Sequence, residues 1–170
     1  IVYYATKELG FSSTQALNAV TVATVVTTLL IPLMGALSDG IGRKTVYIDG
    51  VLMMMAYAFP YFWLLQTRSF SMLILATVIG LGVIWAPTTA VLGTMFSEIF
   101  KSNVRYTGIT LGYQIGAALA GGTAPLVATF LLAKFDHSYV PIALYIIFTG
   151  LVSLVAIAAV SERSGRQLDE

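Results

Sequence analysis

The sequence predicts an all-α protein, a polytopic transmembrane helical bundle, and three observations carry this prediction. Hydrophobic residues make up 58% of the 170 residues, only 10% are charged, and the mean hydropathy is +0.87, whereas a soluble domain has about 25% charged residues. Long uncharged stretches separate the charges, and a helix needs about 20 mostly apolar residues to cross a bilayer. These stretches are unbroken runs rich in Leu, Ala and Val, whereas a transmembrane β-strand alternates apolar and polar residues over about ten positions.

The uncharged stretches predict five spans after a short apolar segment. We place the spans at about 15–37, 46–66, 70–95, 107–132 and 139–160. Segment 1–5 is too short to cross a bilayer and is interpreted as the stub of an earlier helix, so the membrane region is 6–160 and a tail follows at 161–170. The chain opens at Ile1 without a basic region or a cleavage site, so we expect a piece of a longer protein and no signal peptide.

The Lys and Arg residues predict the orientation, because positive residues concentrate on the cytoplasmic side of a membrane. If the loop at 39–45 lies in the cytoplasm, the basic residues divide six inside and three outside. The inner ones are Arg43, Lys44, Lys101, Arg105, Arg163 and Arg166, and the outer ones are Lys7, Arg68 and Lys134. The C-terminal tail is then cytoplasmic.

The composition also excludes several classes of function. A net charge of +1 provides no field that would attract a polyanion, so we expect no nucleic-acid partner. There is no cysteine and a single histidine, and no paired carboxylates or phosphate-binding loop fall in one place. We therefore expect no metal site, no cofactor and no enzyme activity.

The loop after the first span has an unusual charge pattern. Residues 35–44 read Gly-Ala-Leu-Ser-Asp-Gly-Ile-Gly-Arg-Lys, and the dipole of the preceding helix favours Arg43 and Lys44 at its C-terminal end. The same dipole disfavours Asp39, which is expected to need a guanidinium or the N-terminus of another helix as its partner. The glycines before Arg43, Gly42 among them, allow the chain to reverse. The alternative is a basic hairpin that only determines topology.

Small residues form a stripe on the fourth span, and polar residues form a second stripe on the first span. On the fourth span, Gly108, Gly112 and Gly116 recur every fourth residue, which favours close helix packing and permits a neighbour to slide. Tyr113 and Gln114 adjoin this stripe and are expected to face the bundle interior or a wet cavity.

The first span carries a polar face that includes Thr21, whose hydroxyl can line a solute path or bond its own helix. Trp85 and Thr88 flank Pro87 near the middle of the third span, where an aromatic ring with neighbouring hydroxyls suits a small polar or zwitterionic solute; Trp85 can equally fill space. Pro87 and Pro125 are expected to kink their helices, either as packing features or as flexible points.

The pattern Gly-x-x-x-Asp-x-x-Gly-Arg-Lys between two spans resembles the loop signature of the major facilitator superfamily, which lies between the second and third helices of each six-helix half. The segments Glu98–Gly108 and Leu111–Pro125 resemble the loop and penultimate helix of its metabolite:proton symporter family, which includes carriers of proline and betaine, shikimate, 2-oxoglutarate and citrate. The tail Ser161–Arg166 is similar to the Pro-Glu-Thr-x-Gly-Arg ending of such carriers, with Ser for Pro and Arg for Thr. The resemblance implies the C-terminal six-helix half of a major facilitator fold with its first helix truncated.

This resemblance implies a fragment of a secondary active transporter that moves a small polar organic solute with protons across the bacterial cytoplasmic membrane by alternating access. Its partners are the missing N-terminal half, the solute, protons and lipid. The expected substrate-binding residues are Thr21, Trp85, Thr88, Tyr113 and Gln114. A conformational charge latch is expected from Asp39, Gly42, Arg43, Lys44, Glu98, Arg105 and Glu162.

Asp49 and His137 are titratable, but neither is expected to carry protons. Asp49 is assigned to the cytoplasmic charge cluster, and His137 to a solvated outer loop. A proton-carrying group is therefore expected in the absent half. The alternatives are a passive facilitator on the same fold and a membrane scaffold that transports nothing.

Overall fold

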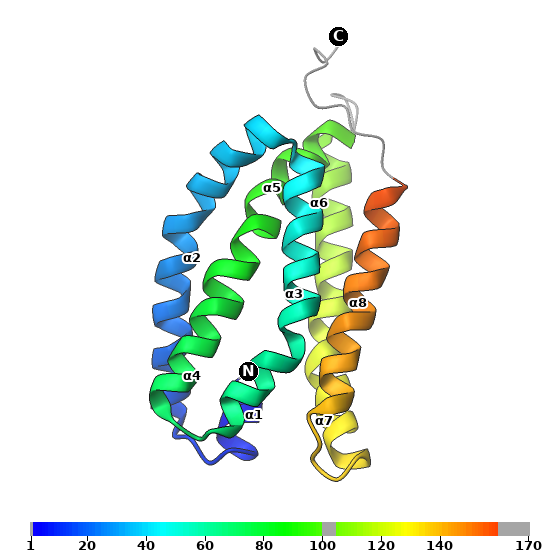
Figure 1. Cartoon of the computed structure of the whole chain (residues 1–170). Helices are drawn as coiled ribbons and strands as arrows, with labels where there is room; N and C mark the ends of the chain where they lie inside the picture. Colours follow the sequence, from blue (N-terminus) through cyan, green and yellow to red (C-terminus); the bar gives the residue numbers. More distant parts are fainter. Residues whose placement is uncertain (1, 100–104, 160–170) are drawn as a thin grey trace.

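The computed structural model describes residues 2–99 and 105–159, and this part of the chain is helical almost throughout (Figure 1). No strand occurs within the described residues. The elements in chain order are α1 (Val2–Lys7), α2 (Ser13–Ile41), α3 (Arg43–Gln66), α4 (Phe70–Thr77), the π-helix η1 (Val78–Ile84), α5 (Trp85–Ile99), α6 (Arg105–Gly116), the π-helix η2 (Ala117–Gly121), α7 (Gly122–Lys134) and α8 (Val140–Ala158).

Five helical stretches within the described residues are long and apolar enough to cross a membrane. They are Ser13–Ile41, Arg43–Gln66, Phe70–Met95, Tyr106–Lys134 and Val140–Ala158. The third stretch combines α4, η1 and most of α5, and the fourth combines α6, η2 and α7. The all-α polytopic bundle predicted from the sequence is confirmed.

Local signals in the sequence explain where α2 begins and ends. At its start the Ser12 hydroxyl accepts a hydrogen bond from the Gln15 backbone N–H at 3.1 Å, and the Gln15 side chain accepts one from the Ser12 N–H at 3.0 Å. This capping box satisfies two backbone donors that the helix leaves open. The helix ends at Gly42, whose φ of +97° lies in the region that favours glycine. The turn between α2 and α3 is therefore a single residue, shorter than the expected loop.

Three glycines place neighbouring helices in close contact. A Cβ built on Gly50 would lie 2.7 Å from the Thr88 Cγ2, one on Gly82 would lie 3.1 Å from the Val26 Cγ1, and one on Gly150 would lie 2.5 Å from the Met55 Cγ. These positions join α3 to α5, α2 to η1, and α3 to α8, which are also the most extensive helix contacts of the bundle.

One cluster of buried residues gathers at the end of the bundle that we call the α1 end, which lies at the bottom of Figure 1. The Phe62 ring is central to it: its centroid lies 5.3 Å from that of Tyr4 on α1 and 5.5 Å from that of Tyr139 at the start of α8. Leu65 and Leu73 of the same cluster are almost fully buried. Aromatic packing therefore joins α1, α3 and the start of α8 at this level.

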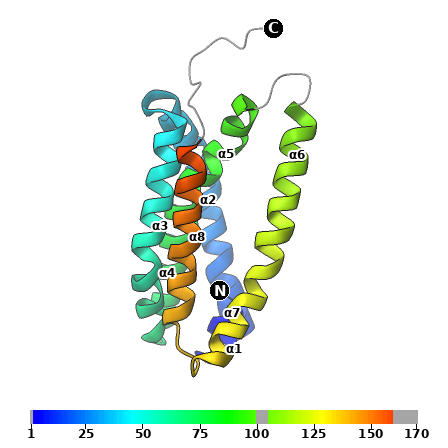
Figure 2. The ribbon, with the colours of Figure 1, turned by 90° about the vertical axis from the view of Figure 1, so that its right-hand side faces the viewer.

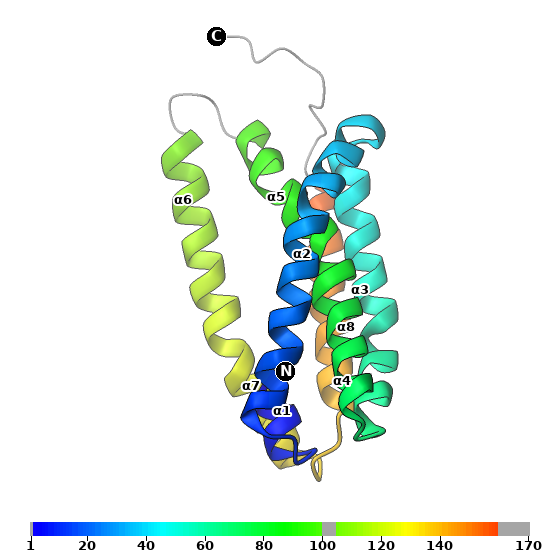
Figure 3. The same ribbon diagram turned by 90° about the vertical axis from the view of Figure 1, so that its left-hand side faces the viewer.

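The helix formed by α6 and η2 stands apart from the rest of the bundle, on the side opposite α3 (Figures 2 and 3). Residues 110–123 are all exposed, and no residue of η2 is buried. The span Tyr106–Lys134, to which this helix belongs, is apolar enough to cross a membrane, and such a helix is normally surrounded by protein or lipid. The described chain supplies only part of this surrounding.

Both π-helices lie directly before a proline. η1 ends three residues before Pro87, and η2 ends four residues before Pro125. Proline lacks the N–H that would close the α-helical turn and clashes with the carbonyl four residues earlier. The kinks expected at the two prolines stay a prediction, while the structure has a widened turn on the N-terminal side of each proline.

Candidate functional site

The five residues expected to bind solute lie on three helices and at different heights. At a rise of about 1.5 Å per residue, Thr21 lies about 12 Å, Trp85 about 22 Å and Tyr113 about 31 Å from the α1 end of their helices. Thr88 and Gln114 fall between the last two levels. Trp85 thus lies near the middle of its span, Thr88, Tyr113 and Gln114 lie nearer the opposite end of the bundle, and Thr21 lies nearer the α1 end.

The threonine hydroxyls of α2 mostly bond their own helix. Thr21 donates to the Leu17 carbonyl at 2.9 Å and Thr24 to the Val20 carbonyl at 2.8 Å. Thr27 differs, because its hydroxyl lies 2.8 Å from the Ala23 carbonyl and also 2.7 Å from the Leu81 carbonyl of η1. Thr27 lies off the polar face predicted for this span, and its partner on another helix leaves no signal in the local sequence.

Thr88 contributes to helix packing at the start of α5. Its hydroxyl donates to the Trp85 carbonyl at 2.9 Å, and its methyl group lies against Gly50 of α3. Trp85 and Tyr113, by contrast, have about half of their surface exposed, at 50% and 53%, and Gln114 is exposed as well. These three side chains are therefore available to a ligand or to further protein.

The charge pattern of the first loop forms the expected ion pair. Arg43 Nη2 lies 3.4 Å from Asp39 Oδ1, with Asp39 four residues earlier and 69% of its side chain exposed. This guanidinium offsets the unfavourable position of a carboxylate at the C-terminal end of α2. Gly42 lets the chain turn between the two charges, and Lys44 follows in the first turn of α3.

The rest of the predicted latch lies outside the described part of the chain. This applies to Glu162 and to the side chains of Glu98 and Arg105. Asp49 is exposed on α3, one turn beyond Lys44.

Two of the three glycines of the predicted stripe, Gly112 and Gly116, face open space within the described part of the chain. A Cβ on Gly112 or Gly116 would meet no described atom within 4 Å, and Gly108 is partly buried. The glycines that do bring helices together are Gly50, Gly82 and Gly150, which the stripe pattern did not indicate. Sequence spacing shows that small residues share a face but not which face meets a neighbour.

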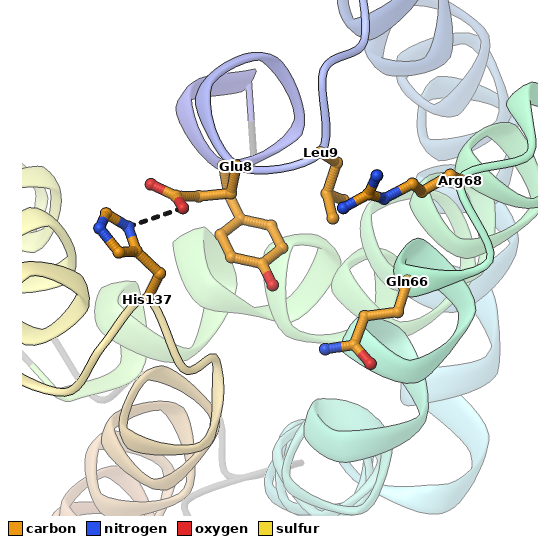
Figure 4. A pocket seen from close by; sticks show the side chains of 6 residues that line it. Glu8, Leu9, Gln66, Arg68 and His137 are labelled. Atoms are coloured by element: carbon orange, nitrogen blue, oxygen red, sulfur yellow. Dashed lines mark hydrogen bonds and ion pairs between the residues drawn. The ribbon is translucent and has the colours of Figure 1, made fainter.

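A cavity of about 320 Å³ opens at the α1 end, lined by Tyr4, Glu8, Leu9, Gln66, Arg68 and His137 (Figure 4). His137 Nδ1 lies 2.8 Å from Glu8 Oε2 and joins the turn after α1 to the loop between α7 and α8. The imidazole is 69% exposed, as expected of a loop residue, but the pair with Glu8 was missed. The two residues lie 129 positions apart, so no local pattern could have indicated it.

Comparison with known proteins identifies the family. The family model of the Major Facilitator Superfamily matches residues 1–167. The chain is 32% identical over 168 residues to an ectoine/proline transporter of Corynebacterium glutamicum, covering 97% of the chain and 32% of that relative. It is 29% identical over 150 residues to a shikimate transporter of Escherichia coli, covering 88% and 34%, and 26% identical over 158 residues to a citrate-proton symporter of Klebsiella pneumoniae, covering 93% and 35%.

The chain thus spans about a third of the length of these relatives. No solved structure matches the chain. The match of the family model over nearly all residues, together with five helices able to cross a membrane, confirms the resemblance seen in the sequence. The chain is a multi-pass membrane protein, and it belongs to the Major Facilitator Superfamily.

Proposed function

We propose that the chain is the C-terminal part of a secondary active transporter that moves a small polar organic solute together with protons by alternating access. The observation that carries this proposal is the similarity along almost the whole chain to carriers whose names state ectoine, proline, shikimate or citrate as solutes. In such a carrier the solute binds near the membrane midplane between two halves that rock against each other. The missing N-terminal half is then the main partner.

The solute site is assigned to the region between the middle of the bundle and the end opposite α1. Trp85, Tyr113 and Gln114 are exposed there and supply an aromatic ring, a phenol and an amide. Polar groups at this depth normally face a protein interior or a wet cavity, because lipid cannot bond them. Thr88 lies one helical turn after Trp85 and is assigned to the same region. Thr21 is assigned to the path between this region and the α1 end.

The α1 end is assigned to the outside of the bacterial cytoplasmic membrane and the Gly42 end to the cytoplasm, with the C-terminus inside. Asp39, Gly42, Arg43 and Lys44 then belong to a cytoplasmic latch that closes when the carrier opens outward. The pair between Arg43 and Asp39 supports this assignment. The described spans place no histidine in the middle of the bundle and only Asp49 near a span interior, so the proton-carrying group is assigned to the absent half.

The test is uptake of a panel of labelled solutes by the full-length carrier in vesicles, with and without an imposed proton gradient. Uptake of one solute that rises with the gradient supports the proposal. Equal uptake with and without the gradient would identify a passive facilitator. No uptake of any solute by correctly inserted protein would identify a membrane scaffold.

A further inference from the structure

The cavity at the α1 end contains charged groups that the proposed function does not use. Three segments distant in sequence form it: the end of α1 with Tyr4 and Glu8, the end of α3 with Gln66 and Arg68, and the loop before α8 with His137. Its volume of about 320 Å³ lies at the lower end of the range of about 300–1,000 Å³ that is typical of small-molecule sites. The cavity lies far from Trp85 and Tyr113 along the bundle, so it is distinct from the proposed solute site.

The two charges of this cavity lie on different walls. Figure 4 shows Arg68 reaching across from the turn after α3, while Glu8 and His137 lie on the other side. Within the described residues no carboxylate pairs with the Arg68 guanidinium. Glu8 has only 15% of its side chain exposed and uses one oxygen, Oε2, for His137. Its second carboxylate oxygen keeps acceptor capacity.

The floor of the cavity offers neutral polar groups and an apolar contact. The Gln66 amide lies beside the Tyr4 hydroxyl, and Leu9 closes one side. Arg68 and His137 both have positive φ values, at 54° and 60°, which L-residues with a side chain seldom adopt. The local backbone thus holds both side chains in position at some energetic cost.

We propose that this cavity is a binding site for a small zwitterion, a molecule with one carboxylate and one amine cation. The carboxylate pairs with the Arg68 guanidinium, whose planar donors match a carboxylate in two parallel hydrogen bonds. The amine cation faces the second oxygen of Glu8, and the carbon body lies on Leu9 and the Tyr4 ring.

The balance of charge selects this class of ligand over others. Glu8 and Arg68 place one negative and one positive charge on the walls of the cavity. A dicarboxylate would bring its second negative group against Glu8, and a simple cation would meet Arg68 without compensation, and each like-charge contact disfavours binding. A neutral molecule with separated charges avoids both penalties.

The test uses cysteine labelling: this chain contains no cysteine, and any cysteine in the rest of the carrier is first replaced by serine. A Leu9→Cys carrier, solubilised in detergent so that both faces are accessible, is labelled with a maleimide in the presence of L-proline. Cyclopentanecarboxylate and pyrrolidine are rings of the same size that keep only one of the two charges. Ser13→Cys, exposed at the start of α2 and outside the cavity, is the matched control.

We expect L-proline to slow labelling of Leu9→Cys by about tenfold. At the same concentration each single-charge analogue should have little effect, because the loss of one charge-assisted contact weakens binding by roughly tenfold. Arg68→Gln or Glu8→Gln in the Leu9→Cys background should abolish the protection, whereas Lys7→Gln and Asp136→Asn, which remove charges at the same end, should leave it. Labelling of Ser13→Cys should not change.

Several results would overturn the proposal. Equal labelling with and without L-proline excludes a zwitterion site, and equal protection by all three rings excludes recognition of both charges. Protection that survives Arg68→Gln would come from a conformational change caused by binding elsewhere. If the Leu9→Cys carrier fails to fold, equilibrium dialysis of labelled L-proline with the Arg68→Gln and Lys7→Gln carriers decides: only Arg68→Gln should lose one bound molecule per carrier.

The proposal rests on the proposed function only for the view that zwitterions reach this protein. The two can fail separately, because protection without proton-driven uptake keeps the site and refutes the transport. Uptake without protection refutes the site and keeps the transport.

Discussion

The contact between Gly50 of α3 and Thr88 of α5 provides a direct test of the helix packing. A methyl group added at Gly50 would lie 2.7 Å from the Thr88 Cγ2 and 3.3 Å from both the Pro87 Cβ and the Thr88 backbone N. A backbone atom cannot rotate away, so Gly50→Ala should force the two helices apart. Overpacking of this kind costs about 1–3 kcal/mol, and the better helix propensity of alanine offsets about 1 kcal/mol of it.

The expected net loss for Gly50→Ala is therefore up to about 2 kcal/mol of unfolding free energy. Thr88→Ser removes the methyl group that lies closest and should cost about 1 kcal/mol by itself. In the double variant the worst clash is gone, so the two changes should compensate each other by roughly 1–2 kcal/mol, within the range for contacting residues. Gly40→Ala, which meets no described atom within 4 Å, is the control.

The assay is reversible unfolding of the solubilised carrier, compared among wild type, the two single variants and the double variant. The reasoning is refuted if the free energies of the single changes simply add in the double variant. It is also refuted if Gly50→Ala is as stable as Gly40→Ala. Either result would mean that α3 and α5 do not approach each other as closely at this level.

Three further predictions concern the latch, the solute site and the cross-helix hydrogen bond. Asp39→Asn should reduce uptake by the full carrier at least about tenfold while membrane abundance stays normal, because an exposed ion pair adds at most about 1 kcal/mol of stability; normal uptake would remove Asp39 from the latch. Gln114→Ala should raise the apparent KM for the solute by about tenfold, as expected when one polar contact is lost, and an unchanged KM excludes it from the site. Thr27→Val should lower the unfolding free energy by about 1 kcal/mol more than Thr24→Val, since only Thr27 bonds another helix. Equal effects of the two valine variants in unfolding experiments would show that the bond to η1 contributes nothing.

The features that the sequence predicted correctly depend on neighbouring residues. The ion pair of Asp39 with Arg43 joins positions four apart, and the turn at Gly42 requires only the freedom of one residue. The position of a membrane span is equally local, since a continuous stretch of about 20 apolar residues suffices for a crossing.

The features that the sequence could not indicate join distant segments. Thr27 meets a carbonyl 54 residues later, and Glu8 meets His137 across 129 residues. The glycine stripe of α6 was visible, but within the described chain the close contacts occur at other glycines, Gly50 among them. Which faces meet depends on how the helices rotate and cross, and hydropathy contains no information on either.

The sequence alone thus determined the class of the protein, the number of membrane-crossing helices and the family, because apolar length and a short loop motif are local properties. Only the tertiary structure decided which side chains share a surface: it separated Thr88, packed on Gly50, from the exposed Trp85, and it brought Glu8, Arg68 and His137 around one cavity. The physical reason is that a bilayer selects helices by composition, whereas shape and charge between helices select their arrangement.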